Sequence, residues 1–301
     1  MPSVLVTCQY RSRPFHEFSN AGPQFWADTT PECGANRQSP INLVDDELTS
    51  VTYDDFVFQG YDSEEEGAGT LVSISNLGHT VRINIDGTFR ISGGGLPTEY
   101  EALQAHFHWG TISQQGSEHA INGRLFPLEM HIVHYAYREY NSSVLTAAKS
   151  GNKDALAVLG VLFEIGEDDN DIFDEIFNGV SQIEFQDDEY FFQRVVSLSD
   201  LLPEDKSRFY RYDGSLTTPS CYEVVQWTVF EETVEISERQ VNLFRQLTTG
   251  LFNESYLTGN TYRPLQPRRD REVYYSHATM TEPLGLLAAT VAMLLFLLKE
   301  M

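Results

Sequence analysis

The chain has 301 residues, with 20 basic and 44 acidic side chains and a formal net charge of −24 at pH 7. Its hydrophobic fraction of 41% and aromatic fraction of 12% are enough for a folded core, which excludes a disordered acidic tail. A chain this acidic argues against binding nucleic acid or anionic lipid through a basic surface. The length allows one large domain or two small ones.

Strand patterns dominate the middle of the chain, and no repeat or Pro/Ser-rich linker divides it. Residues 81–85, 89–92 and 223–229 alternate with period two, as half-buried strands do. Residues 155–163 are continuously apolar and rich in Val and Leu, which favours a strand buried on both faces. These patterns predict a mostly β domain.

Helical segments are few and short, and two stretches are strongly acidic. Residues 45–66 and 164–189 hold most of the clustered acids, and we expect them to form solvated surface. Calcium or mineral binding is a weaker alternative, because the spacing of a hand-type calcium loop is missing. Ser237 begins a capping-box pattern, which predicts a helix start. The helices are predicted over residues 143–150, 173–179 and 237–248.

Five of the eight histidines lie within about thirty residues of one another. Period two places Gln104, His106 and His108 on one face of a predicted strand. A second predicted strand, residues 128–134, places Glu129 and His131 together on one face. If the two strands are neighbours, the three histidines converge and form a full ligand set for tetrahedral zinc, with the fourth position open.

A ligating histidine normally donates its other ring N–H to an acceptor. Gln104 and Glu129 each precede a histidine of the set by two residues and can supply that acceptor. An open zinc site activates water near neutral pH, and a histidine off the metal can carry the proton away. A His-x-His pair on a strand is more often plain surface or core, so the pattern alone leaves both interpretations open.

The two ends of the chain and its three cysteines leave several alternatives. Residues 4–6 are the only apolar run near the N-terminus and are too short for a signal-peptide core, so we expect no signal peptide in the sequence as given. Residues 284–298 carry no charge, and a buried helix, a short membrane span and a cleaved glycolipid-anchor tail all fit their length. We expect membrane attachment, with the glycolipid anchor favoured. Cys8, Cys33 and Cys221 are either three reduced thiols or one disulfide pair and one remaining thiol.

Two asparagines, Asn141 and Asn253, begin glycosylation triplets, which occur by chance in chains of this length.

The sequence resembles the alpha-class carbonic anhydrases, most closely their secreted or membrane-anchored branch. The resemblance covers nearly the whole chain from Phe15 to Tyr275, with the matching segments in order and at the family's spacing. They are residues 22–23 with Trp26, 37–41, 104–110, 116–119, 129–134, 157–160, 212–219, and Asn260 with 263–264.

The resemblance implies an α+β, mostly β single domain on a large twisted, mainly antiparallel sheet with a few short surface helices. That domain is expected over residues 14–277, with residues 1–13 as an N-terminal remnant or tail and 278–301 as a membrane anchor. The implied activity is the reversible hydration of carbon dioxide to bicarbonate and a proton by zinc-bound hydroxide. The alternative is a non-catalytic relative that binds a partner or mineral, a class that usually lacks one or more of the zinc histidines.

The resemblance also implies a role for each matched position. His106, His108 and His131 are expected to bind Zn²⁺, with Gln104 and Glu129 behind them. Thr217 is expected to orient the attacking hydroxide and to pass its own proton to Glu118. His79 falls where fast members of the family keep their proton shuttle, and His119 and His134 match buried structural histidines. The carbon dioxide pocket is expected to comprise Val133, Val158, Leu216, Thr218, Val225 and Trp227.

Some positions depart from the family pattern. Residues 15–18 lack the usual tryptophan and tyrosine, and Leu77 and Arg82 border the expected shuttle where other residues are common. These departures put the turnover rate in doubt more than the reaction. Cys33 and Cys221 match the single disulfide of the secreted and membrane-bound branch, so the extracellular face of the plasma membrane, or secretion, is the expected location.

Overall fold

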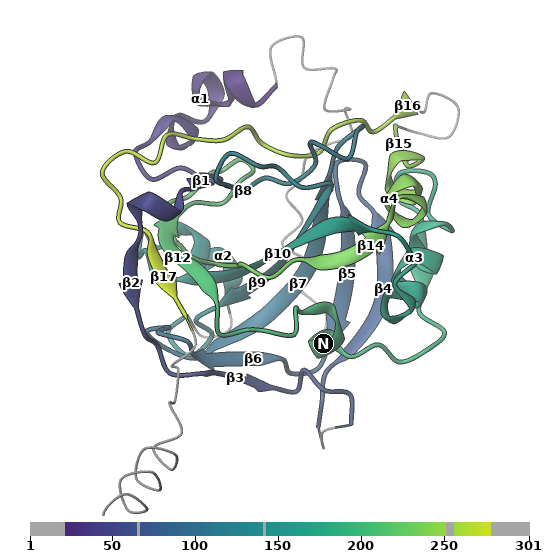
Figure 1. Cartoon of the computed structure of the whole chain (residues 1–301), viewed down its shortest axis with the longest axis horizontal. Helices are drawn as coiled ribbons and strands as arrows, with labels where there is room; N and C mark the ends of the chain where they lie inside the picture. The colour runs from purple at the N-terminus through teal and green to yellow at the C-terminus, as the bar shows by residue number, and fades with distance from the viewer. Residues whose placement is uncertain (1–21, 65–66, 141–142, 251–255, 278–301) are drawn as a thin grey trace, which may run out of the picture.

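The structure is a computed structural model that describes residues 22–64, 67–140, 143–250 and 256–277. A 13-stranded sheet organises this part of the chain (Figure 1). The main path through it runs β11 (Glu189–Phe191), β4 (Thr70–Asn76), β5 (Val81–Asp86), β7 (Tyr100–Trp109), β9 (Leu128–Tyr135), β10 (Leu156–Gly166), β13 (Val225–Phe230), β12 (Phe209–Gly214), β17 (Tyr274–Ser276) and β2 (Thr49–Val51).

The remaining strands are short. β14 (Val234–Ser237) pairs with β10, while β6 (Arg90–Gly93) pairs with β3 (Phe56–Gln59) and β7. Separate two-stranded sheets join β1 (Asn42–Leu43) to β8 (Ala120–Ile121) and β15 (Thr248–Thr249) to β16 (Tyr256–Leu257). In the large sheet, β10 is parallel to β13 and β14, and β17 is parallel to β2, while the other pairs are antiparallel. The predicted mostly β, mainly antiparallel domain is confirmed.

The centre of the sheet is its most apolar part, and this explains where the chain folds into strands. The first eight residues of β10 and all eight of β9 are buried. The continuous apolar run of β10 suits a strand covered on both faces, as predicted. Two clusters of buried side chains lie against these central strands. The core therefore fixes β9, which pairs with β7, and β10, which pairs with β9 on its other side.

The helices are short and lie outside the sheet. They are α1 (Trp26–Thr29), α2 (Val144–Lys149), α3 (Asp174–Val180) and α4 (Glu238–Arg245), with 3₁₀ turns at Pro23–Phe25, Pro31–Gly34, Asp45–Glu47, Asp171–Phe173 and Leu198–Leu201. The capping box predicted at Ser237 is confirmed, because its side chain accepts from the Gln240 N–H and the Gln240 side chain accepts from the Ser237 N–H. The predicted helix is too long at its other end, since Thr248 and Thr249 form β15.

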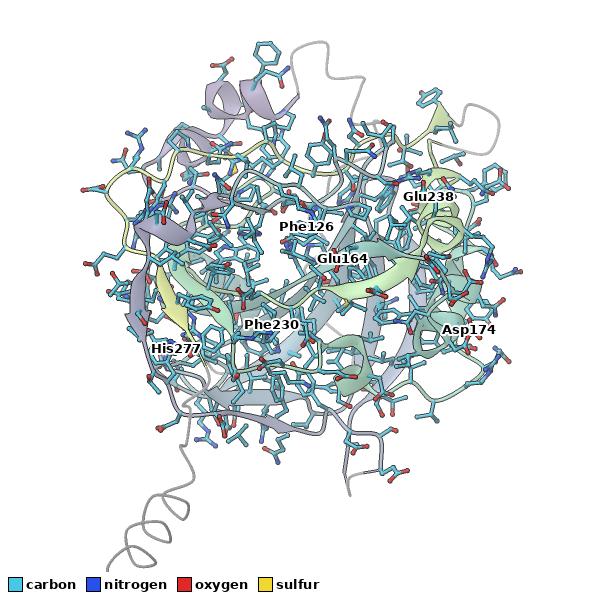
Figure 2. The ribbon with its side chains drawn as sticks, viewed as in Figure 1. Phe126, Glu164, Asp174, Phe230, Glu238 and His277 are labelled. Carbon is cyan, nitrogen blue, oxygen red and sulfur yellow. A yellow bond between two sulfur atoms is a disulfide. The ribbon has the colours of Figure 1, made fainter. Side chains whose placement is uncertain are left out.

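The acidic stretches lie mainly at the surface. Asp174 stands in the first turn of α3, and Figure 2 shows it at the periphery of the molecule. Carboxylates there also interact favourably with the positive ends of the helix dipoles. Among the described residues, groups of three or more potential metal ligands within 4.8 Å of one another occur only among histidines and Glu129.

Several sequence predictions fall outside the described residues. These are the remnant 1–13 with Cys8, the glycosylation candidates Asn141 and Asn253, and the apolar tail within 278–301. Within the described ranges, no helix combines the length and the apolar character needed to cross a membrane.

Candidate metal centre

The pairing of β7 with β9 brings the three predicted ligands together. The two strands are antiparallel, with His106 opposite His131 and His108 opposite Glu129. Side chains of directly opposed residues project from the same face, so the three imidazoles share one side of the sheet. Their ring centroids lie 4.7 to 5.1 Å apart in pairs. One ligand atom from each ring lies within 4.8 Å of those of the other two, a separation that suits a single metal ion.

Each of the three imidazoles has a hydrogen-bond acceptor beside one of its two ring nitrogens. Nδ1 of His106 lies 3.1 Å from Oε1 of Gln104, and Nε2 of His131 lies 2.7 Å from Oε1 of Glu129. Gln104 and Glu129 thus each contact the histidine two residues further along, as the sequence predicted. Nδ1 of His108 lies 2.8 Å from the carbonyl oxygen of Thr261. Sequence reasoning missed this third acceptor because a carbonyl oxygen 153 residues away leaves no side-chain signal.

Burial favours the neutral form of His106 and His131, the form that metal ligation requires. Burial lowers the pKa of His106 well below its ordinary value, and the neighbouring His108 and His131 lower it further. Burial also lowers the pKa of His131, although Glu129 opposes that shift. Burial alone would raise the pKa of Glu129, but the adjacent His119 and His131 bring it well below its ordinary value. The two histidine shifts therefore favour neutral rings, and Glu129 is held in its ionised form beside them.

Two polar atoms at this site are buried without any hydrogen-bond partner among the described residues. They are Nε2 of His108 and Oε2 of Glu118, which lie 3.5 Å from each other. A buried polar atom without a partner is costly, so such atoms usually mark an ion, a water or a reacting group. Three converging imidazoles with one buried ring nitrogen left free therefore fit a metal ion.

The predicted contact between Thr217 and Glu118 is not among the hydrogen bonds of the described chain. Oε1 of Glu118 accepts from the backbone N–H of Arg263 at 2.7 Å, while Oε2 faces the histidines. Thr217 is buried on the loop after β12. The partner of Oε1 comes from an irregular segment, so local sequence patterns gave no indication of it.

The predicted apolar wall is a contiguous surface. Val158 on β10 stands opposite Val133 of β9 on one side and Trp227 of β13 on the other. The ring of Trp227 lies 4.8 Å from that of His131, so the wall directly adjoins the candidate ligands. Val133, Val158, Val225 and Trp227 belong to one buried cluster, and Leu216 packs against it. Thr218 is half-buried beside Thr217.

His79 is exposed on the turn between β4 and β5, with its Nδ1 3.1 Å from the carbonyl oxygen of Leu77. Gly78 has a φ of +79°, which glycine adopts without strain and which allows the tight turn. Desolvation lowers the pKa of His79, and repulsion by His108 and Arg82 lowers it further. His79 is therefore electrostatically coupled to a candidate ligand while its side chain still reaches solvent.

His119 belongs to a hydrogen-bonded chain behind the ligands, as predicted for a buried structural histidine. Its Nδ1 lies 2.7 Å from Oε1 of Glu129, and its Nε2 lies 2.6 Å from the hydroxyl of Tyr212. Glu129, His119 and His131 also satisfy the distances of a metal site. Because one carboxylate oxygen contacts both rings at hydrogen-bond distance, we interpret this group as the support of His131. His134 is buried elsewhere and contacts Tyr61.

The predicted pairing of Cys33 and Cys221 is confirmed by a disulfide whose Cα atoms lie 4.9 Å apart. Cys221 donates its backbone N–H to the carbonyl of Thr218 at 2.8 Å. The bond therefore anchors the loop that carries Thr217 and Thr218 to the 3₁₀ turn at Pro31–Gly34.

Comparisons with known proteins agree with this geometry. Over 271 residues, the chain is 37% identical to carbonic anhydrase 4 from Rattus norvegicus, covering 86% of this chain and 81% of the relative. It is 39% identical to carbonic anhydrase 15 from Mus musculus over 264 residues, which are 84% of this chain and 79% of the relative. It is also 35% identical over 266 residues to receptor-type tyrosine-protein phosphatase zeta from Homo sapiens, covering 85% of this chain but only 11% of that protein.

A family model described as eukaryotic-type carbonic anhydrase matches residues 21–277. That range includes every residue of the candidate metal centre, and it confirms the resemblance found in the sequence. The chain therefore belongs to the eukaryotic-type carbonic anhydrase family.

Proposed function

We propose that the chain catalyses the reversible hydration of carbon dioxide to bicarbonate and a proton, with zinc held by His106, His108 and His131. The observation that carries the proposal is the convergence of three imidazoles with the unpartnered Nε2 of His108 among their ring nitrogens. Zinc bound by three histidines supplies a Lewis acid that ionises water near neutral pH, and carbonic anhydrase is the familiar example of that chemistry.

We assign the orientation of the attacking water to Thr217 and Glu118. A hydroxyl can accept one hydrogen bond from the water and donate its own proton to a carboxylate. The free Oε2 of Glu118 provides that acceptor, and its other oxygen is already fixed by Arg263. The wall of Val133, Val158 and Trp227 offers carbon dioxide an apolar surface beside the ligands.

We assign proton export to His79. Its lowered pKa keeps the ring neutral at pH 7, so it can accept a proton and release it to solvent. The half-buried Arg82 lies opposite His106 across β5 and β7 and adds a positive charge close to this route.

The competing function is a non-catalytic binding module. The match to a small part of receptor-type tyrosine-protein phosphatase zeta shows that a similar domain also occurs inside a much larger protein. The complete histidine set, with Glu118 and Thr217 beside it, favours the enzyme.

We further propose an extracellular, membrane-attached location. The disulfide between Cys33 and Cys221 supports an oxidising compartment, and the uncharged residues 284–298 support an anchor.

Removal of zinc should abolish activity. After dialysis against a strong chelator, stopped-flow hydration of carbon dioxide is expected to fall to the uncatalysed rate and to return with one equivalent of zinc. Retention of activity by verified zinc-free protein would contradict the mechanism. No hydration with one zinc bound per chain would instead favour the binding module.

Glu129→Gln should weaken zinc binding by about 10- to 100-fold, because the amide cannot supply the negative charge that supports His131. Competition with a chromogenic chelator measures the affinity, and circular dichroism verifies the fold. Glu164→Gln on β10 is the matched control, since Glu164 contacts Thr233 and Arg124 outside the site. Equal zinc affinities of the two variants would remove Glu129 from the metal support.

His79→Ala should slow turnover in weakly buffered solution, by up to about 10²-fold, and imidazole should restore it. A proton acceptor works only when neutral, so the His79-dependent rate should rise with pH through a pKa below the ordinary value of about 6.5. His277→Ala, which removes an exposed histidine at the chain's edge, should leave turnover unchanged. Turnover of His79→Ala equal to wild type without added imidazole would show that another group carries the proton.

Phosphatidylinositol-specific phospholipase should release the protein, without its cleaved C-terminal tail, from the surface of cells that express the full chain if a glycolipid holds it. Immunoblots of the medium measure the release. Protein that stays on treated cells would indicate a membrane span instead, and protein found in the medium before treatment would indicate secretion.

A further inference from the structure

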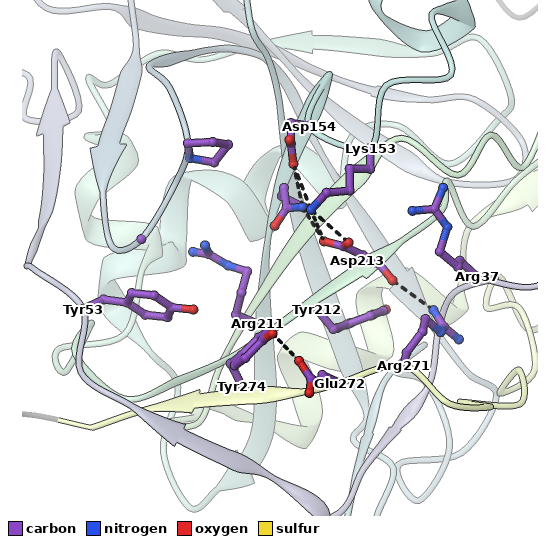
Figure 3. A pocket seen from close by; sticks show the side chains of 13 residues that line it. Arg37, Tyr53, Lys153, Asp154, Arg211, Tyr212, Asp213, Arg271, Glu272 and Tyr274 are labelled. Carbon is purple, nitrogen blue, oxygen red and sulfur yellow. Dashed lines mark hydrogen bonds and ion pairs between the residues drawn. The ribbon is translucent and has the colours of Figure 1, made fainter.

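A second polar cavity lies away from the histidines, with a volume of about 450 Å³. It is formed where β12, β13 and β17 meet the segments before β3, after β6 and before β10. No histidine lines it, and the function proposed above does not use it. Its walls, shown in Figure 3, comprise Arg37, Tyr53, Gly95, Pro97, Lys153, Asp154, Arg211, Tyr212, Asp213, Gln226, Arg271, Glu272 and Tyr274.

Arg211 is the unusual member of this lining. Its side chain is 97% buried by surface area, since only 3% remains exposed. Its guanidinium donates to the hydroxyl of Thr228 and to the carbonyl of Gly94 at 2.9 to 3.1 Å. Within the described residues, no carboxylate lies within 4.0 Å of it, and Nη1 makes no hydrogen bond. Buried charges are normally paired at contact distance, whereas Asp213 attracts this cation only from further away.

The acids that line the cavity are already engaged elsewhere. Lys153 contacts both Asp154 and Asp213, at 3.5 and 3.1 Å. The Gln226 side-chain amide donates to the same two carboxylates, and Glu272 accepts from the hydroxyl of Tyr274. Figure 3 shows these contacts as dashed lines, whereas none reaches Arg211. Lys153 thus serves two carboxylates, while two arginines of the lining, Arg211 and Arg271, have no carboxylate at ion-pair distance among the described residues.

Aromatic rings complete the surroundings of Arg211. The guanidinium carbon of Arg211 lies 5.7 Å from the ring centre of Tyr53, and Tyr274 lines the same space. Such rings offer a flat apolar surface to a planar ligand. A multiply charged anion such as phosphate would meet repulsion from three nearby carboxylates, whereas a singly charged one would gain the arginine without as large a cost.

We propose that this cavity is a binding site for a small aromatic monocarboxylate, whose carboxylate pairs with Arg211 and whose ring lies against Tyr53. Arg is suited to this partner because its planar fork matches the two oxygens of a carboxylate. The volume falls within the range of ordinary small-molecule sites, roughly 300 to 1,000 Å³. The proposal does not depend on the hydration of carbon dioxide.

Isothermal titration of the zinc-loaded protein with benzoate tests the site. Saturable binding of one benzoate per chain is expected, and Arg211→Met should weaken it at least tenfold, because a charge-assisted hydrogen bond is lost. Arg211→Lys should retain part of the affinity. Arg194→Met, which removes an arginine with a 73% exposed side chain outside the cavity, is the matched control and should bind as wild type.

Benzoate could also reach the metal centre, and His106→Ala separates the two sites. Binding that survives His106→Ala but falls in Arg211→Met supports the cavity. Binding lost in His106→Ala and unchanged in Arg211→Met overturns the proposal, as does an absence of binding to the wild-type protein.

A further variant keeps the test decisive if Arg211→Met does not fold, as judged by thermal melting. Tyr53→Ala leaves the cation in place and removes the ring. It should lower the affinity for benzoate several-fold more than that for acetate. Equal losses for both ligands, or no loss, would contradict the proposed orientation.

Discussion

The register between β7 and β9 is the constraint on which the metal centre depends. Side chains alternate between faces, so a slip of one residue would move His131 to the opposite side of the sheet from His106. The register is fixed from the far side by β10, whose Val158 stands opposite Val133 of β9. Because β9 and most of β10 are fully buried, a slip would also disrupt the core. The packing of apolar strands thus holds the polar site in place.

Glu129 extends this constraint from the strands to the loop beside them. Its Oε1 contacts the rings of His119 and His131, and its Oε2 accepts from the backbone N–H groups of Glu118 and His119, each at 2.8 Å. A buried carboxylate is stable only when its oxygens are satisfied in this way. The same bonds fix the position of Glu118, so one side chain aligns both a metal ligand and the carboxylate next to it.

Local patterns in the sequence could predict the parts of the site that the strands provide. Period two placed Gln104, His106 and His108 on one face, and the sheet confirms it. The acceptors of His108 and Glu118 come instead from Thr261 and Arg263, on a segment without regular structure. Their backbone atoms carry no side-chain signature, and only the folded chain brings them near.

The disulfide is another feature that local sequence patterns could not predict. The number of cysteines allowed either three free thiols or one disulfide and one free thiol. The family resemblance, and not the count, selected the pair Cys33 and Cys221. Cys33 and Cys221 are 188 residues apart in the chain. No local pattern connects positions so distant, because their proximity results from the whole topology.

The interior also shows why the net charge of −24 says little about the chemistry. Exposed charges further apart than about 8 Å are largely screened at physiological ionic strength, whereas buried ones are not. Arg263 is 2% exposed, and its Nη atoms are enclosed by Gln38 and by the carbonyls of Cys33 and Ser39. Arg211 is buried to a similar extent, but it lines a cavity. The first cation joins segments of the fold, while the second has room beside it for an anion.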